Sequence, residues 1–144
     1  MKLTNHVKIN LPAVVGNESF ARAAVAAFCT PLSPSLEEIN DIKTAVSEAV
    51  TNVIAHAYPE RSGEAEVEVA IYDDKVITIT VTDEGIGFAD VNQAKKPFYT
   101  TKSAEEHSGM GFTIMEAFMD ELEVRSEPGR GTRVTMRKAI KQHA

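Results

Sequence analysis

The sequence predicts an α+β domain, an α/β sandwich in which helices cover one face of a mixed, mostly antiparallel sheet. Two observations indicate the sheet: alternating apolar and polar residues flank a short polar turn in residues 66–81, and the same pattern returns in residues 122–136. A third observation indicates the helices, because apolar residues recur at helical spacing before the first hairpin and between the two hairpins. With 144 residues, 43% of them hydrophobic, the chain is expected to form one domain, residues 1–144, around one core.

The first two elements are expected to be an edge strand and a helix. Residues 7–11 alternate between apolar and polar side chains, and Pro12 ends that pattern. Asn17 is the expected N-cap of a helix that Pro31 stops. The side chains that repeat at helical spacing, and should face the core, are Phe20, Ala23, Ala24, Ala27 and Phe28.

A second helix should begin at a capping box. Ser35 and Glu38 have the Ser-x-x-Glu spacing in which each side chain bonds the backbone amide of the other residue. Tyr58 precedes Pro59, and a residue before proline disfavours the helical conformation, so the helix should end there. Its apolar stripe consists of Ile39, Ile42, Val46, Ala49, Val50 and Val53.

Two hairpins and one further helix complete the expected order. The helix, residues 109–120, should turn Ile114, Met115, Phe118 and Met119 toward the core. One face of the sheet would then remain open to a partner. The expected hairpin strands are residues 66–71 with 76–81, joined by Asp73-Asp74-Lys75, and residues 122–124 with 132–136, joined by residues 128–131.

Composition excludes several classes of protein. A formal net charge of -6, with Lys and Arg scattered, argues against direct binding of nucleic acid. The single cysteine, Cys29, lies in an apolar run, so we expect a buried thiol in a reducing compartment rather than a disulfide. No stretch approaches the roughly 20 apolar residues that cross a bilayer, and the start of the chain has no hydrophobic signal core. A cytoplasmic protein without membrane contact is expected.

Glu48 and Asn52 are the strongest candidates for chemistry. They are four residues apart and therefore share one face of the second helix, away from the centre of its apolar stripe. An Asn in mid-helix gains little unless its amide has a partner, and Mg²⁺ takes such oxygen ligands while bridging to phosphates. Glu48 could then accept a proton from an attacking hydroxyl. The alternative is that both belong to a solvated face. His56, next on the same line, either satisfies a helix-end carbonyl or joins the site.

Two glycine turns follow that helix. Asp83 precedes Gly85 and Gly87, so its carboxylate could accept a hydrogen bond from an exocyclic amine while the glycines clear space for a flat base. The alternative is an ordinary Asp-Gly turn. Gly109 and Gly111 at the start of a helix present amide groups where a phosphate can bind. In this order, the motifs indicate an ATP site.

These motifs resemble the successive boxes of the GHKL ATPases, the superfamily of histidine kinases, gyrase B and MutL. The resemblance rests on Glu48 with Asn52, Asp83-x-Gly85-x-Gly87, Gly109-x-Gly111 and Gly131-Thr132. It implies the Bergerat fold, in which Asn52 would bind Mg²⁺, Asp83 would bind adenine and Thr132 would lie near the base. The segment between Asp83 and Gly111 would form the ATP lid.

Within that superfamily the chain is most similar to the compact bacterial anti-sigma serine kinases. Nothing ahead of Glu48 is long enough for the phosphoacceptor hairpin of the two-component histidine kinases. The similarity to the sporulation branch of these kinases extends over nearly the whole chain. It is carried by residues 17–22, 46–52, 97–102 and 108–116.

This resemblance implies a homodimer that holds the sporulation sigma factor, sigma F, inactive in its ATP form. It also implies phosphorylation of a serine on an anti-anti-sigma factor. Glu48 would be the general base, and Arg22 would lie on the surface used by both partners, although the sequence alone favours Arg22 as a solvated helix residue. The residues expected to bind the nucleotide are Asn52, His56, Asp83, Gly85, Gly87, Thr100, Thr101, Lys102, Ser108, Gly109, Met110, Gly111, Phe112 and Thr132.

Two positions bear on the alternatives. The family often carries Arg where this chain has His107, so any charge supplied to the γ-phosphate there depends on pH. That difference leaves open a sigma-binding protein that is gated by ATP and turns over little. Gly87 is usually missing in the general-stress anti-sigma kinases, so its presence favours the sporulation branch over that second alternative.

Overall fold

A five-stranded antiparallel sheet forms the base of the computed structural model, which describes residues 1–95 and 111–141. The strands lie in the order β1-β2-β3-β5-β4, and each of the four neighbouring pairs is antiparallel. The α+β class is therefore confirmed, with an antiparallel sheet. The strands are β1 (Leu3–Pro12), β2 (Glu64–Tyr72), β3 (Val76–Asp83), β4 (Glu121–Glu127) and β5 (Gly131–Ala139).

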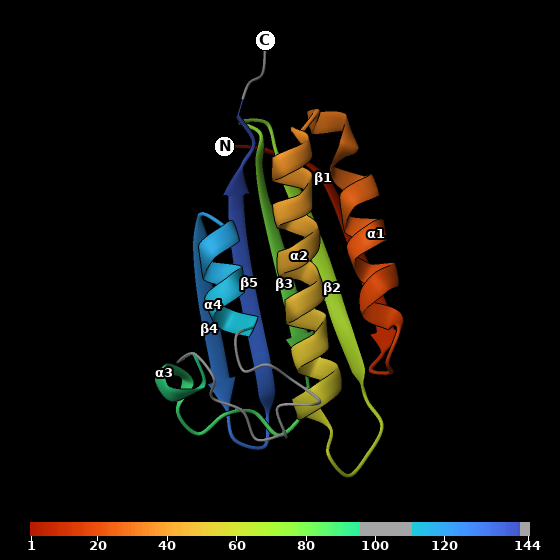
Figure 1. Ribbon diagram of the computed structural model, residues 1–144, viewed down its shortest axis with the longest axis vertical. Helices are drawn as coiled ribbons and strands as arrows, with labels where there is room; N and C mark the ends of the chain where they lie inside the picture. Colours follow the sequence, from red (N-terminus) through yellow and green to blue (C-terminus); the bar gives the residue numbers. More distant parts are fainter. Residues whose placement is uncertain (96–110, 142–144) are drawn as a thin grey trace.

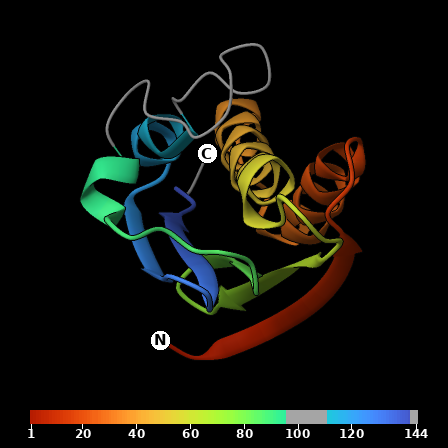
Figure 2. The ribbon, with the colours of Figure 1, turned by 90° about the horizontal axis from the view of Figure 1, so that it is seen from below.

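Three helices lie on one face of this sheet. They are α1 (Asn17–Cys29), α2 (Leu36–Asn52) and α4 (Gly111–Phe118), and the view from below shows them on the same side, with no described helix on the opposite face (Figures 1 and 2). The shorter elements are a 3-10 turn (Thr30–Leu32), a π-helical turn (Val53–Ala57) and α3 (Val91–Ala94). Within the described ranges, no helix has the length and apolar character that a bilayer crossing requires.

Strand β1 is an edge strand, as the alternation predicted. It pairs with β2 from Leu3↔Tyr72 to Pro12↔Glu64, with one irregularity between Leu3 and Asn5. The strand begins four residues earlier than the alternating pattern indicated. Apart from Leu3, its sequence before Val7 is polar, and edge positions tolerate such residues because one side of the strand faces solvent.

The expected inner face of α1 was wrong except at Phe28, which packs against the core while partly buried. Ala21, Val25 and Cys29 are fully buried, whereas Phe20 is 56% exposed. Alanine occurs on every side of this helix, so apolar spacing alone did not distinguish its faces. The expected cap was wrong too: the N-cap is Gly16, in the left-handed region at φ 106°.

The main core lies between α2 and the sheet. Of the predicted stripe, Ile42, Val46, Ala49, Val50 and Val53 are buried and Ile39 is partly buried, so this face is confirmed. Cys29 is fully buried in the same core, and burial raises the pKa of its thiol to about 12. The expected buried cysteine is therefore confirmed.

Helix α4 ends two residues earlier than expected, and one of its predicted core residues is wrong. Met115 and Met119 are buried, but Phe118 is 39% exposed and Ile114 is only partly buried. The helix ends at Phe118, so Met119 reaches the core from the turn that follows. Helical periodicity therefore does not predict which side chains after Phe118 face the core.

Lys138 fastens the end of α4 to the sheet. Its Nζ donates to the Phe118 carbonyl at 2.8 Å and lies 3.7 Å from Asp41 Oδ2 of α2. Lys138 is 8% exposed and is on the helix-facing side of β5. The carbonyl and the carboxylate compensate for the burial of its charge.

The capping box of α2 generates a stability prediction. Ser35 Oγ accepts from the Glu38 amide at 3.0 Å, and Glu38 Oε1 accepts from the Ser35 amide at 2.8 Å. Ser35→Ala should lower the free energy of unfolding by about 1 kcal/mol, the usual effect of losing a helix cap. Urea unfolding measures this, with Ser62→Ala in an exposed loop as the control. Equal stability of the two variants would contradict the assignment.

Candidate functional site

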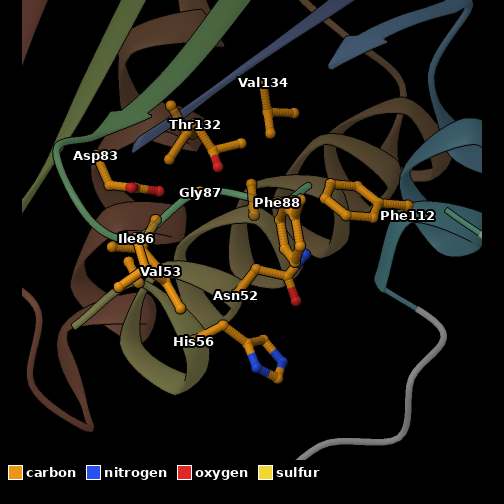
Figure 3. A pocket seen from close by; sticks show the side chains of 13 residues that line it. Asn52, Val53, His56, Asp83, Ile86, Gly87, Phe88, Phe112, Thr132 and Val134 are labelled. Carbon is orange, nitrogen blue, oxygen red and sulfur yellow. The ribbon is translucent and has the colours of Figure 1, made fainter. Parts of the chain in front are cut away.

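A pocket opens between α2 and the sheet, where β3 ends. The helical side supplies Asn52 and His56, and the sheet supplies Asp83 and Thr132 from the neighbouring strands β3 and β5 (Figure 3). The chain thus brings together side chains that are up to 80 positions apart. The complete lining is Ala49, Asn52, Val53, His56, Ala57, Val81, Asp83, Ile86, Gly87, Phe88, Phe112, Thr132 and Val134.

Asp83 provides a buried carboxylate at the sheet side of the pocket. Its side chain turns into the pocket (Figure 3), and the residue is 7% exposed. Burial raises the pKa of the carboxyl, while hydrogen bonds from the backbone of Gly85 and Thr132 act in the opposite direction. The Gly85 amide donates to Asp83 Oδ1 at 2.9 Å. The carboxylate keeps lone pairs with which it can accept a hydrogen bond from a ligand N–H group.

Gly85 and Gly87 allow other parts of the backbone to approach closely. A Cβ on Gly85 would lie 2.1 Å from the Ala57 carbonyl oxygen. Gly87 has φ +70°, and a Cβ there would lie 2.2 Å from the Glu127 carbonyl oxygen. The sequence suggested that these glycines make room for a flat base. In the structure, protein backbone occupies the space that their side chains would fill.

Asn52 carries a buried carbonyl oxygen at the pocket. Among the described residues, Oδ1 of Asn52 has no hydrogen-bond partner. A Cβ on Gly111, the first residue of α4, would lie 3.1 Å from both end atoms of the carboxamide. An unpartnered buried oxygen is costly unless a donor or a cation meets it. The position therefore fits an oxygen ligand for Mg²⁺, which prefers such ligands and retains several waters.

Glu48 lies one turn before Asn52 and lines a different hollow. Burial raises the pKa of its carboxyl above the usual value. The hollow lies against α1 and α2 and brings Glu48 together with Arg22, whose Nη1 donates to Ser47 Oγ at 3.4 Å. The remaining residues of this hollow are Asn40, Lys43 and Thr44. Helix α2 thus presents Asn52 to the pocket and Glu48 to the surface that carries Arg22.

His56 belongs to a π-helical turn rather than to a continuing α-helix. The regular helix ends at Asn52, and the wider turn spans Val53–Ala57. His56 is 8% exposed and lines the pocket. The Ala57 carbonyl at the end of the turn accepts a hydrogen bond from the Ile86 amide at 2.9 Å. Such turns often occur at functional sites.

Part of the expected site lies outside the described residues. It includes the predicted contacts to the phosphates and the position that distinguishes this chain from the family pattern. Their roles stay predictions. The residues concerned are Thr100, Thr101, Lys102, His107, Ser108, Gly109 and Met110.

Two groups of residues at the site were not predicted from the sequence. Ser126 bonds Phe88 and Thr132, and its signal was a hydroxyl at an inward position of β4, after Leu122 and Val124. Phe88 packs edge to face on Phe112, with ring centroids 6.0 Å apart. The second missed group is the hydroxyl of Tyr58, which nothing in the local pattern distinguished.

Comparison with known proteins assigns the chain to a family. The model of the histidine kinase-like ATPase domain matches residues 11–138. An anti-sigma F factor of Caldanaerobacter subterraneus subsp. tengcongensis is 54% identical over 140 residues, 97% of each chain. The anti-sigma F factor of Clostridium novyi is 53% identical over 138 residues, 95% of this chain and 96% of that one.

Solved structures share the fold at lower identity. The RsbU and RsbW domains of Rv1364c from Mycobacterium tuberculosis align with a TM-score of 0.70 at 22% identity, over 98% of this chain and 33% of that one. The mycobacterial sensor histidine kinase MprB gives 0.57 at 17% identity, over 73% and 74%. The matched domain and the near full-length similarity agree with the arrangement of Asn52 and Asp83 around one pocket. The chain belongs to the histidine kinase-like ATPase domain family and, within it, to the anti-sigma F factors.

Proposed function

We propose that this protein binds and inhibits the sporulation sigma factor sigma F and, with ATP and Mg²⁺, phosphorylates a serine of an anti-anti-sigma factor. One observation carries the proposal. Helix α2 presents Asn52 to a pocket that contains Asp83, and one turn earlier it presents Glu48 to a hollow that contains Arg22. A nucleotide and a protein substrate can therefore meet across a single helix. The names of the similar anti-sigma F factors support the choice of partner.

The pocket offers complementary groups to the two ends of ATP. The Asp83 carboxylate can accept a hydrogen bond from the adenine amine, and Thr132 lies beside it with a hydroxyl. The apolar side chains of Val53 and Ile86 can flank the base. Asn52 Oδ1 would hold Mg²⁺, which when bound neutralises charge on the phosphates.

Glu48 is the proposed general base. The oxygen of the substrate serine forms a bond to the γ-phosphorus as the bond to the β,γ-bridging oxygen breaks, which gives phosphoserine and ADP. Glu48 takes the proton from the serine hydroxyl. Burial raises the pKa of Glu48, which makes its ionised form a better proton acceptor than an exposed glutamate.

A second copy of the chain is the proposed partner in a homodimer. Among the described strands, β1 pairs only with β2, so its other edge leaves backbone donors and acceptors for another chain. Most homodimers use one surface on both copies. The cytoplasmic location and the single domain over residues 1–144 stay predictions.

Substitution of Glu48 tests the enzyme. We expect Glu48→Gln to lower the rate of phosphoserine formation by at least about a hundredfold, the usual contribution of a general base. ATP affinity should stay unchanged, because Glu48 does not line the nucleotide pocket. Mass spectrometry of a candidate anti-anti-sigma protein and calorimetry with ATP measure the two quantities. Glu37→Gln, in the exposed first turn of the same helix, is the matched control.

The pH dependence provides a second readout of the same residue. Glu48 must be ionised to accept a proton, so the rate should fall as the pH drops through its raised pKa and this limb should disappear in Glu48→Gln. Unchanged phosphotransfer in the variant would remove Glu48 as the base. A wild-type chain that captures sigma F and makes no phosphoserine would instead support the binding protein gated by ATP.

Removal of the Asn52 carboxamide tests the metal site. Mg²⁺ should strengthen ATP binding to the wild-type chain, and Asn52→Ala should lose that gain. Mutation of a residue that only hydrogen-bonds a metal ligand usually lowers metal affinity by about tenfold or more. Loss of the direct ligand Asn52 should therefore lower the affinity by at least about tenfold. Titration of ATP with Mg²⁺ and with EDTA measures it, and Asn10→Ala on β1 is the control. An equal Mg²⁺ effect in both variants would exclude Asn52 as a ligand.

Reversal of the charge on Arg22 tests the partner surface. Arg22→Glu should weaken capture of sigma F and of the anti-anti-sigma protein by about tenfold or more, because like charges at an interface repel. ATP affinity should not change. Arg125→Glu, on the exposed outer side of β4, is the control. Capture is compared with ATP and with ADP, since only a difference in affinity lets the nucleotide choose the partner. Full capture by Arg22→Glu would place the partner elsewhere.

A further inference from the structure

Two side-chain hydroxyls hold the backbone of residues 84–88, here called the purine turn, from opposite sides. The turn follows Asp83 and supplies Ile86, Gly87 and Phe88 to the pocket. Tyr58 bonds its first residue and Ser126 bonds its last. Neither Tyr58 nor Ser126 lines the pocket itself.

The Tyr58 hydroxyl fixes the start of the turn. It accepts from the Glu84 amide at 2.9 Å and donates to the Glu64 carbonyl at 2.7 Å. Arg61 lies over the tyrosine ring, 5.0 Å from its centroid, and its Nη2 donates to the Glu84 carbonyl at 2.6 Å. A Cβ on Gly63 would lie 2.2 Å from the ring, so the glycine lets the ring lie flat against the backbone. The position of the phenol oxygen is therefore well determined.

The Ser126 hydroxyl fixes the end of the turn and also reaches Thr132. Its Oγ accepts from the Phe88 amide at 2.7 Å, and it lies 3.0 Å from the Gly131 carbonyl oxygen and 2.8 Å from Thr132 Oγ1. A serine hydroxyl has one proton. If Ser126 donates its proton to the Gly131 carbonyl, the Thr132 hydroxyl must donate to Ser126 and can only accept a hydrogen bond from a ligand. If Ser126 instead donates to Thr132, the Thr132 hydroxyl keeps its own proton for a hydrogen bond to a ligand. Ser126 thus controls which hydrogen bond Thr132 can offer.

Between these hydroxyls, backbone bonds complete the attachment of the turn. The Ile86 amide donates to the Ala57 carbonyl at 2.9 Å, and the Gly129 amide donates to the Ile86 carbonyl at 2.7 Å. These central bonds need no side chain, whereas the end of the turn depends on the Ser126 hydroxyl and its start on the Tyr58 hydroxyl together with Arg61. Loss of a hydroxyl should therefore loosen one end of the turn and leave the fold in place.

We propose that Ser126 and Tyr58 are positioning residues of the nucleotide site, which set the affinity for the purine end of the nucleotide by holding the purine turn and Thr132 against Asp83. This inference rests on the proposed ATP site. The two residues act through the turn, and their substitution changes purine binding without changing contacts to the γ-phosphate.

The experiment uses the full chain with ADP and ATP at 25 °C, with Ser126→Ala and Tyr58→Phe as the variants. Each removes hydrogen bonds from one end of the turn, so the dissociation constant for ADP should rise by about fivefold to tenfold. The ratio of the ATP and ADP dissociation constants should stay at the wild-type value, because that ratio reports only the γ-phosphate. Ser126→Thr keeps the hydroxyl and should recover most of the affinity.

Three controls separate positioning from general stability. Thr80→Ala and Tyr72→Phe remove hydroxyls from the open face of the sheet, and Val25→Ala opens the core beneath α1. Val25→Ala should lower the unfolding temperature and leave ADP binding unchanged.

Hydrogen exchange without nucleotide should show faster exchange of the Phe88 amide in Ser126→Ala and of the Glu84 amide in Tyr58→Phe.

The outcomes distinguish the two proposals. Wild-type affinity for ADP in both Ser126→Ala and Tyr58→Phe overturns this inference and leaves the ATP site standing. Equal weakening of ADP binding in Val25→Ala also overturns it, since the effect would then follow stability. A wild-type chain that binds neither ADP nor ATP overturns the proposed function itself.

Discussion

The attachment of residues 84–88 to both the π-helical turn after α2 and the β4–β5 hairpin determines the geometry of the site. The Ile86 amide meets the Ala57 carbonyl on the helix side, and the Ile86 carbonyl meets the Gly129 amide on the hairpin side. Gly85 and Gly87 permit both approaches, because a side chain at either position would collide with backbone. The distance between helix and sheet at this end, and hence the width of the pocket, follows from this contact.

Most of the fold could be predicted from the sequence because its signals are local. Alternation identified both hairpins, and the Ser35–Glu38 box identified the start of α2. The failures occurred where local signals were degenerate. In α1, alanines on every side concealed the buried face. Packing against α2 decides which side of the helix is buried, and it leaves Val25 inside and Phe20 exposed. In α4, the end of the helix at Phe118 changed the direction of the residues after it.

The candidate site was predictable only where single residues carry unusual chemistry. Asn52 in mid-helix and Asp83 before two glycines could be recognised from their type and position, and the structure brings both into one pocket. Ser126 could be recognised only as a hydroxyl at an inward position, because its importance depends on the register that places it opposite Thr132 on β5. Tyr58 could not be recognised, because it contacts the Glu84 amide 26 positions away. Long-range pairing of this kind leaves no trace in spacing.

Within residues 1–95 and 111–141, no group donates to the buried oxygen of Asn52, and this implies a conflict between stability and activity. A buried acceptor without a donor makes the empty protein less stable than it would be with an apolar side chain of similar size at that position. Selection for robustness alone would therefore replace this asparagine, whereas occupancy by a ligand that supplies the missing contact compensates for it. The filled chain should accordingly resist heat and proteolysis better than the empty one, and cellular nucleotide levels would influence how long each molecule survives.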